Sequence, residues 1–435
     1  MTKMHTLLLP LFFTFLTLSQ SQPHSDAPPS STVCIIGAGI GGSSVAHFIR
    51  KYSPDLTPTT KIQVFERNNI VGGRIATVTI AGETFEAGAS ILHPKNLHAV
   101  TYTKLLKLKD AVDRFSKYYE ETGSRPIFET VDEMLKWSGL FNLTTRTLQD
   151  ELVDAGLSPL LINELVTVIT RINYGQSVYM SGLGGAVSLA GSGGGLWSIE
   201  GGNFQMAAGL INRSEVALHL QEEIKSVADL GDYYELNSTK GNSYICDVAV
   251  VATPLDELNI QFIPPISIPE RKLQHTHATF VRGLLNPVYF GLKAAAKIPD
   301  LVATLEDPKL PFTSISVLKE HNEEESTYKI FSRQPMTDIL LDSIFSVRKE
   351  TIRINWAAYP QYHAPEIFAP FILDGRHLYY VNAFENAAST METSAVAAEN
   401  IARLILSRYF GKVSVHSSNL NLKASSQEED AHLDL

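Results

Sequence analysis

Apolar residues 33–36 run directly into a glycine-rich turn, and the chain continues with helical spacing of apolar positions over 43–52. This succession predicts a buried strand, a tight turn and an amphipathic helix, the opening of a dinucleotide-binding βαβ unit. Gly37, Gly39 and Gly42 hold the glycine positions of a GxGxxG pattern. We expect Gly37 to permit the turn, Gly39 to let the backbone approach a pyrophosphate, and Gly42 to let helix and strand pack closely.

A second apolar run, residues 61–66, predicts the next parallel strand and ends in an acid. Glu66 follows Gly42 by 24 positions. That spacing is close to the roughly 20 residues expected for the carboxylate that binds a ribose hydroxyl. A glycine turn with an unrelated surface glutamate is the alternative.

Gly72, Gly73 and Arg74 resemble the extension that marks FAD-binding members of the amine oxidase and phytoene desaturase superfamily. There the paired glycines and the arginine contact the FAD phosphates, which implies that FAD is the cofactor. Gly88 and Ser90 lie in a Glu-Ala-Gly-Ala-Ser run, where this superfamily brings the backbone close to the flavin.

The rest of the chain alternates between strand and helix patterns. Strands are predicted over 75–80, 84–90, 216–228, 233–236, 243–245, 247–254, 278–282, 285–290 and 377–382. Helices are predicted over 97–108, 131–135, 147–155, 160–171, 206–211 and 391–409. The glycine-rich stretch 181–202 predicts open backbone that approaches a ligand or forms a lid. The acidic stretch 319–326 predicts a solvated loop.

These patterns predict an α/β protein with an FAD/NAD(P)-binding Rossmann-like fold of the amine oxidase and glutathione reductase type. An α+β substrate domain is inserted into it. The FAD-binding domain is expected in three parts, residues 32–92, 201–255 and 372–412. Between them lie a helical substrate region, 93–200, and the substrate domain, 256–371.

The last part of the chain carries two further expected cofactor contacts. In folds of this type the N-terminus of the late helix faces the flavin pyrimidine carbonyls, where negative charge grows on reduction. Glu385 sits where such families place an acid near the ribityl chain or the pyrophosphate, and Thr393 offers a backbone donor. A surface helix capped by Glu392 is the alternative.

The net charge of −10 argues against nucleic acid as a partner.

Lys3 precedes an apolar run over 7–18, which predicts a signal peptide over 1–21, with an uncleaved anchor as the alternative. Residues 22–31 predict a disordered lead-in and residues 413–435 a polar tail. No later stretch has 18 uninterrupted apolar residues, so no membrane span is expected in the mature protein.

The secretory pathway is supported by three glycosylation sequons, at Asn142, Asn212 and Asn237. The chain has two cysteines. Cys34 and Cys246 both lie in strand patterns, and we expect them to be buried, small and apolar, and unpaired.

Three central motifs resemble the prenylcysteine oxidase family, most closely its plant branch. They are Ile-Asn-Tyr-Gly-Gln-Ser at 172–177, Gly-Ala-Val-Ser-Leu at 185–189 and Gly-Leu-Trp-Ser-Ile-Glu-Gly-Gly-Asn at 195–203. The resemblance covers nearly the whole chain, from 33 to 410. It implies an FAD-dependent thioether oxidase in the lumen of the lysosome or vacuole. Such enzymes act on S-prenylcysteine left by the degradation of prenylated proteins.

The family chemistry is hydride transfer from C1 of the prenyl group to the flavin, followed by addition of water. Cysteine and a prenyl aldehyde such as farnesal are released, and O2 is reduced to H2O2. No acid–base pair is strictly required, and no metal-ligand spacing occurs in the sequence. Tyr174, Trp197 and His93 are candidates for the flavin or substrate neighbourhood, with core packing as the alternative. Peripheral membrane contact is expected, and the choice between farnesyl and geranylgeranyl groups stays open.

One departure from the family lies near 108–118, where the chain lacks a longer segment that builds over the substrate cavity. Two other interpretations therefore stay open. One is an FAD amine or polyamine oxidase, which shares the cofactor motifs. The other is an inactive FAD-binding splice form.

Overall fold

The computed structural model describes residues 30–93, 96, 118–119, 125–192, 195–294, 296–322 and 325–412. The predicted signal peptide, nearly all of the lead-in, the helix over 97–108, nearly all of the shortened segment and the polar tail lie outside these residues and stay predictions. Within the described residues, no helix combines the length and apolar character needed to cross a membrane.

A five-stranded parallel sheet forms the nucleotide-binding part, in the order β16-β9-β1-β2-β5. Its strands are β1 (Ser31–Ile36), β2 (Thr60–Glu66), β5 (Ala217–Leu220), β9 (Val248–Val251) and β16 (Leu378–Tyr380). All of β9 and the last four residues of β1 are buried, as expected for parallel strands covered on both faces.

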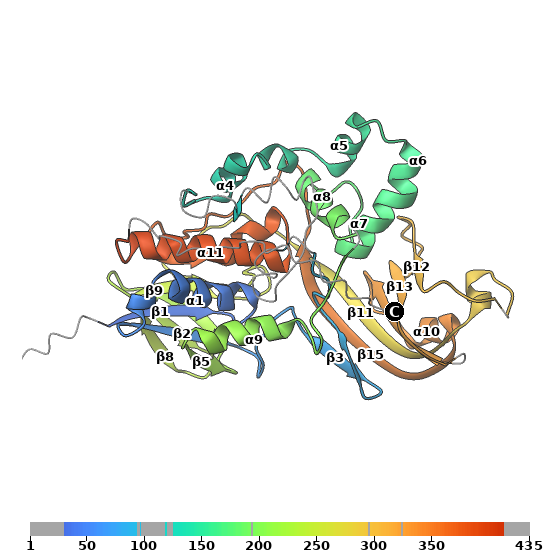
Figure 1. Ribbon diagram of the computed structural model, residues 1–435, viewed down its shortest axis with the longest axis horizontal. Coiled ribbons are helices and arrows are strands. Elements are labelled where there is room, and N and C mark those ends of the chain that lie inside the picture. The colour runs from blue at the N-terminus through green and yellow to red at the C-terminus, as the bar shows by residue number, and fades with distance from the viewer. Residues whose placement is uncertain are drawn as a thin grey trace, which may run out of the picture.

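Three helices cover this sheet: α1 (Ile40–Tyr52), α9 (Phe204–Arg213) and α11 (Met391–Arg408). Helix α1 packs against both α9 and α11, as Figure 1 shows. The predicted Rossmann-like fold is therefore confirmed, with its strands drawn from three separated stretches of chain.

The fold also contains two smaller β-elements. One is a four-stranded sheet in the order β10-β6-β7-β8. Its strands are β6 (Ile224–Asp229), β7 (Tyr234–Ser238), β8 (Ser243–Cys246) and β10 (Gln261–Ile263). The other is the hairpin of β3 (Thr77–Ile80) and β4 (Glu83–Glu86).

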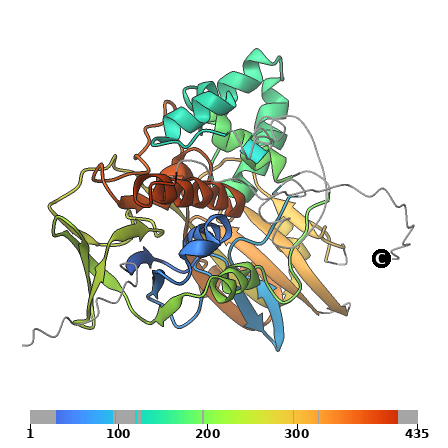
Figure 2. The same cartoon turned by 60° about the vertical axis from the view of Figure 1, so that its left-hand side comes forward.

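A second five-stranded sheet, antiparallel throughout, has the order β12-β13-β14-β11-β15, and we call it the substrate sheet. It comprises β11 (Leu273–Leu285), β12 (Leu301–Ala303), β13 (Ser314–Asn322), β14 (Glu325–Ser332) and β15 (Phe345–Pro360), with helix α10 (Asp338–Ile344) beside it. Figure 2 shows the small four-stranded sheet and the substrate sheet on opposite sides of the molecule.

Two strand and loop predictions in this region are wrong. Residues 285–290 do not form a strand, because β11 ends at Leu285 and Pro287–Phe290 form a 3-10 helix. Pro287 has no N–H for a sheet ladder, and the Asn286 side chain accepts from the N–H of Val288 at 3.2 Å. Residues 319–326 are no solvated loop either, since most of them belong to the paired strands β13 and β14.

The helical region lies above both sheets in Figure 1. It contains α4 (Val131–Ser138), α5 (Leu148–Asp154), α6 (Pro159–Leu161), a π-helical turn (Ile162–Val166), α7 (Thr167–Tyr174) and α8 (Gly182–Ala190). Open backbone is thus a wrong prediction for the first half of 181–202. Ser181 caps α8, and a Cβ at Gly185 would come within 2.5 Å of the Leu148 side chain. The glycines therefore let α8 pack closely on α5.

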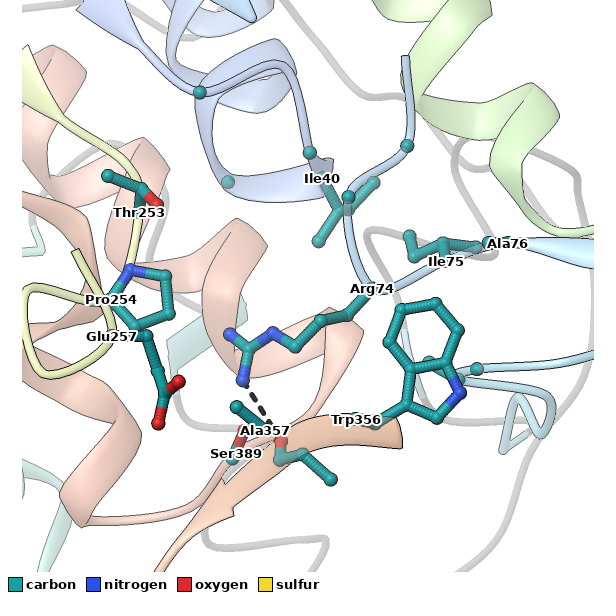
Figure 3. Close-up of a pocket in the computed structure, with 18 of the residues that line it drawn as sticks. Ile40, Arg74, Ile75, Ala76, Thr253, Pro254, Glu257, Trp356, Ala357 and Ser389 are labelled. Carbon is teal, nitrogen blue, oxygen red and sulfur yellow. Dashed lines mark hydrogen bonds between the residues drawn. The ribbon is translucent and has the colours of Figure 1, made fainter. Parts of the chain in front are cut away.

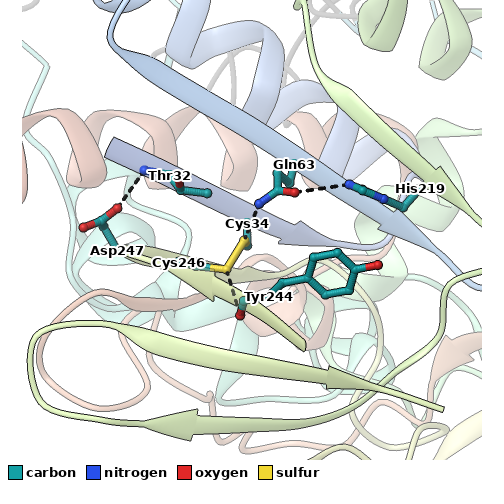
Figure 4. Close-up of a disulfide and its surroundings, with 7 residues drawn as sticks. All are labelled: Thr32, Cys34, Gln63, His219, Tyr244, Cys246 and Asp247. Atoms are coloured by element: carbon teal, nitrogen blue, oxygen red, sulfur yellow. Dashed lines mark hydrogen bonds between the residues drawn. A yellow bond between two sulfur atoms is a disulfide. The ribbon is translucent and has the colours of Figure 1, made fainter. Parts of the chain in front are cut away.

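The prediction that the two cysteines are unpaired is also wrong, because Cys34 and Cys246 form a disulfide (Figure 4). Their Cα atoms lie 5.8 Å apart. Strand β8 turns directly into β9, which pairs with β1, and this places Cys246 beside Cys34. Asp247 and Thr32 exchange two hydrogen bonds of 2.9 and 2.7 Å that fix the junction. Sequence patterns 212 residues apart gave no sign of this contact.

Replacing both cysteines with alanine is expected to lower the free energy of unfolding by about 2–4 kcal/mol, because the bridge closes a very long loop in the unfolded chain. Urea denaturation of the FAD-loaded protein measures the change. An unchanged midpoint, or two titratable thiols in the denatured and unreduced protein, would contradict the pairing.

Candidate functional site

A cavity of about 720 Å³ lies at the carboxyl ends of the nucleotide strands. Ile36, Glu66, Ala252 and Val381, which end or directly follow β1, β2, β9 and β16, all line it. Ligands of open α/β sheets bind at this edge. The opposite wall is made by the ends of β14 and β15 and by α7. The cavity therefore joins the nucleotide fold to the substrate sheet.

Gly37 and Gly42 of the first glycine turn have the structural roles that the sequence predicts. Gly37 has φ +107°, and a Cβ there would come within 2.7 Å of the Ala252 carbonyl oxygen. A Cβ at Gly42 would lie 2.0 Å from the Gly37 carbonyl oxygen, so only glycine lets α1 pack on this turn. Gly39 differs, because its nearest neighbour would be the Gly72 carbonyl oxygen at 3.6 Å. Gly39 lines the cavity, and because it has no side chain, a ligand can approach the backbone there.

A second glycine turn lies against the first. The N–H of Gly72 donates to the Ala38 carbonyl at 3.1 Å, and Gly73 has φ +59°. Gly88 lines the cavity too, where a Cβ would lie 2.0 Å from the Arg74 carbonyl oxygen. Backbone therefore forms much of the cavity wall.

Glu66 ties the end of β2 to the first turn. Its side chain is buried, with Oε2 accepting from Ala38 N at 3.0 Å and Oε1 accepting from Asn68 N and Nδ2 at 2.9 and 2.8 Å. An ionised carboxylate has about four lone-pair sites. Glu66 thus keeps the capacity to accept from a ribose hydroxyl.

Arg74 reaches into the middle of the cavity, between Thr253 and Trp356 (Figure 3). Its Nη1 donates to the Ala358 carbonyl at 2.9 Å, and its Nη2 forms an ion pair with Glu385.

Glu385 is 3% exposed and also accepts from Arg271 at 3.1 Å. Burial alone would raise the pKa of Glu385, but the charges of Arg74 and Arg271 outweigh it and hold the pKa below its ordinary value of 4.5. Glu385 therefore stays ionised and fixes Arg74 in place.

The N-terminus of α11 points its first turn at the cavity, which Ser389, Thr390 and Ser394 line. Thr393 is placed differently from the prediction. Its N–H donates to Thr390 Oγ1 at 3.0 Å and its hydroxyl donates to the Ala388 carbonyl at 2.8 Å. Thr393 builds the helix cap behind the wall, while the helix still presents the positive end of its dipole.

The other predicted residues are not among the described residues that line the cavity. Ser90 is half-buried outside it. Tyr174 is buried and donates to the Ser389 carbonyl at 3.0 Å, and burial raises the pKa of its hydroxyl. Trp197 pairs with Leu92 through two backbone hydrogen bonds. His93, which follows Leu92 in the sequence, donates its backbone N–H to Asn96 Oδ1 at 2.5 Å.

Sequence reasoning missed several lining residues because no strand was predicted over β15, although its apolar positions 352, 354 and 356 alternate with polar ones. Trp356 and Tyr359 lie there, and Trp356 Nε1 donates to the Ala87 carbonyl at 2.8 Å. Lys329 Nζ donates to the neighbouring Glu86 carbonyl at 3.1 Å, and burial lowers the pKa of Lys329 to about 8. Lys329 stands between Tyr328 and Ile330 in β14 and does not itself line the cavity.

The residues present fit FAD. Two glycine turns, a helix N-terminus with no acid in its first turn and the Glu66 carboxylate suit the ADP half. Arg74, the start of α11 and the end of β15 surround the remaining length of the cavity. The described residues contain no cluster of three or more His, Cys, Asp or Glu side chains suited to a metal ion.

Comparison with known families gives two matches along the chain. A family model described as prenylcysteine lyase matches residues 100–417, and one described as NAD(P)-binding Rossmann-like domain matches residues 35–104. A farnesylcysteine lyase of Arabidopsis thaliana is 57% identical over 93% of this chain and 94% of that protein. Prenylcysteine oxidase 1 of Homo sapiens is 32% identical over 88% of this chain and 90% of that protein.

Solved structures share the fold at low identity. A double mutant of putrescine oxidase, made in a redesign of its cofactor binding, has a TM-score of 0.55 and 13% identity over 87% of this chain and all of that one. Cyclohexylamine oxidase from Brevibacterium oxydans IH-35A has a TM-score of 0.55 and 16% identity over 88% of this chain and all of that one.

The Arabidopsis alignment also bears on chain length. It runs over 470 positions, whereas 93% of 435 residues is about 405, so about 65 positions are gaps in this chain. The shortened segment near 108–118 stays a prediction.

Proposed function

Because the chain belongs to the prenylcysteine lyase family, we propose that it is an FAD-dependent oxidase of S-prenylcysteine, with S-farnesylcysteine as its substrate. One molecule each of substrate, O2 and water give cysteine, a prenyl aldehyde and H2O2. The observation that carries the proposal is that a single cavity joins an FAD-type glycine cradle to the wall of the substrate sheet.

The chemistry that FAD supplies when bound is two-electron oxidation of the carbon attached to sulfur, with return of the electrons to O2. The chain itself binds and orients the cofactor and the substrate. The two glycine turns and Glu66 hold the ADP half, and Arg74, fixed by Glu385, offers positive charge to the phosphates. The N-terminus of α11, which lines the cavity, would stabilise negative charge on the bound flavin. Trp356 and other apolar lining residues exclude water from the reacting carbon.

Turnover of S-farnesylcysteine against spermine tests the proposal. Peroxide, cysteine and farnesal in equal amounts are expected from S-farnesylcysteine, and none from spermine. Spermine oxidation would favour an amine oxidase, whose fold this chain shares. FAD bound without turnover of either compound would favour an inactive form, which the gaps in the alignment motivate.

We place the protein in the lumen of the secretory pathway, in the lysosome or vacuole. A disulfide supports this location, because such bonds persist in oxidising compartments.

Asn142 and Asn212 are exposed, whereas Asn237 lies half-buried in β7 between two paired strands. We expect glycans at the first two sites. Endoglycosidase should shift the wild-type band, and the Asn142→Gln/Asn212→Gln variant should show no shift. An unglycosylated wild-type protein would contradict the lumenal address.

Peripheral membrane contact is a further part of the proposal, because a prenylated substrate partitions into lipid. Leu160, Leu161 and Leu165 are 66%, 43% and 51% exposed on the helical region. Leu160→Ser/Leu165→Ser should weaken co-sedimentation with phosphatidylcholine vesicles. Ile339→Ser, at an 86% exposed site on α10, is the matched control. Equal sedimentation of all three proteins would contradict this contact.

A further inference from the structure

An ion cluster lies where α7 meets the substrate sheet. Glu306 accepts from Arg171 Nη1 at 2.5 Å and from both terminal nitrogens of Arg333 at 2.6 and 2.7 Å. Arg171 belongs to α7, and Arg333 directly follows β14. Two guanidinium groups thus share one carboxylate, and the cluster carries a net charge of +1.

The positive groups of this cluster face the cavity. Arg171 and Arg333 both line it, together with Gly175, whereas Glu306 is absent from its lining. Five carboxylates line the cavity, and each lies at the end of a nucleotide strand or in the segment that follows one. They are Glu66, Glu222, Glu223, Glu257 and Glu385. Among the described residues, the wall made by α7 and the end of β14 therefore presents cations without a lining acid.

Arg333 retains hydrogen-bonding capacity toward a ligand. Its Nε donates to the Gly175 carbonyl at 2.9 Å, and two further N–H groups bind Glu306. A guanidinium has five N–H donors, so two remain. The Arg333 side chain is 37% exposed, whereas Arg171 is 2% exposed and is also held by Thr304 through two hydrogen bonds of 3.2 and 3.1 Å. Arg333 is thus the reachable group, and Arg171 fixes the cluster and its charge.

We propose that Arg333, positioned by Glu306 and Arg171, binds the α-carboxylate of the substrate's cysteine moiety. The inference rests on the proposed function, since it assigns the polar end of the same substrate. A net positive wall bearing unused N–H donors matches a carboxylate, which guanidinium groups bind by charge-assisted hydrogen bonds. It follows that the enzyme selects free prenylcysteine over analogues whose carboxylate is missing.

The test compares S-farnesylcysteine with S-farnesylcysteamine, which lacks only the carboxylate, on the FAD-loaded full chain. The wild type should show a KM for the cysteamine about ten- to a hundredfold higher, the value of one charge-assisted contact. Arg333→Gln should raise the KM for S-farnesylcysteine by a similar factor, leave kcat within about twofold, and leave the KM for the cysteamine unchanged. Arg333→Lys should restore part of the affinity.

Arg353→Gln is the matched control, because Arg353 also donates Nε to a backbone carbonyl and Nη2 to an acid, Asp338, but is not among the cavity-lining residues. It should behave as wild type. An Arg333→Gln penalty that is equal for both substrates, or absent, would overturn the assignment and leave the cluster as a clamp between α7 and the sheet.

Calorimetric binding of the same two compounds separates this inference from the proposed function. A wild type that turns over neither compound contradicts the function. Binding that still depends on the carboxylate and on Arg333 would then uphold the inference, and binding that depends on neither would overturn it.

Discussion

We expect a Gly39→Val substitution to leave the protein folded and to remove its FAD. Gly39 lines the cavity with φ −75° and ψ −173°, a conformation that any residue adopts. The nearest protein atom to an added Cβ would be 3.6 Å away, an ordinary contact. We expect FAD affinity to fall at least about a hundredfold, because this glycine position exists to let the backbone approach the pyrophosphate. Flavin absorbance per protein, and calorimetric titration with FAD, measure the loss.

Two other glycines provide the controls. Gly209→Val in α9 adds a side chain at a position with no atom within 4 Å, and should keep its flavin. Gly42→Ala should instead destabilise the fold itself, because its Cβ would lie 2.0 Å from the Gly37 carbonyl oxygen. A folded Gly39→Val protein with a full complement of FAD would show that the phosphates bind elsewhere.

Glu385→Gln is expected to cost about 1.5–3 kcal/mol of folding free energy, because it removes the buried carboxylate that Arg74 and Arg271 share, while Arg271 keeps its ion pair with Asp256 at 2.6 Å. Glu385 is 3% exposed and pairs with Arg74 and Arg271, and Arg271 is itself 9% exposed. Arg74 also loses the group that fixes it, so FAD should bind more weakly. Urea denaturation of the apoprotein and FAD titration measure the two effects separately.

Asp338→Asn is the matched control, since Asp338 also bridges two arginines, Arg348 and Arg353, but is 66% exposed. Exposed pairs contribute little, and this variant should denature like wild type. If Glu385→Gln denatured like Asp338→Asn, the buried cluster would not stabilise the fold.

The pH dependence follows from the same cluster. Because the pKa of Glu385 is below 4.5 in the folded protein, its contribution to stability is fully present above pH 4.5 and is lost as the pH falls through the lowered pKa. The wild type should therefore lose stability below pH 4.5 more steeply than Glu385→Gln does. Denaturation midpoints at a series of acidic pH values test this, and parallel curves would contradict it.

Local patterns predicted the nucleotide side of the site well. The glycine turns, Glu66 and Arg74 line one cavity because their positions follow from short spacings around two strands and one helix. Contacts between distant segments were not predictable in this way. The Cys34–Cys246 disulfide depends on β9 returning beside β1.

The substrate side was predicted poorly for the same reason. Arg171 and Arg333 come together only because the end of α7 packs against the end of β14. Arg171 directly precedes the motif at 172–177, but nothing in the local sequence links it to Arg333. The helix α8 was missed because glycine has a low helix propensity. Close packing on α5 and the Ser181 cap overcome that propensity here. Thr393 was placed on the right helix, but its cap role depends on Thr390 three residues earlier.

Anaerobic absorbance of the purified, FAD-loaded protein during titration with S-farnesylcysteine tests the central claim most directly. We predict that the yellow flavin bleaches in proportion to the substrate added, and that the colour returns with release of H2O2 when air enters. A flavin that stays yellow through the titration would contradict oxidation of prenylcysteine by this protein.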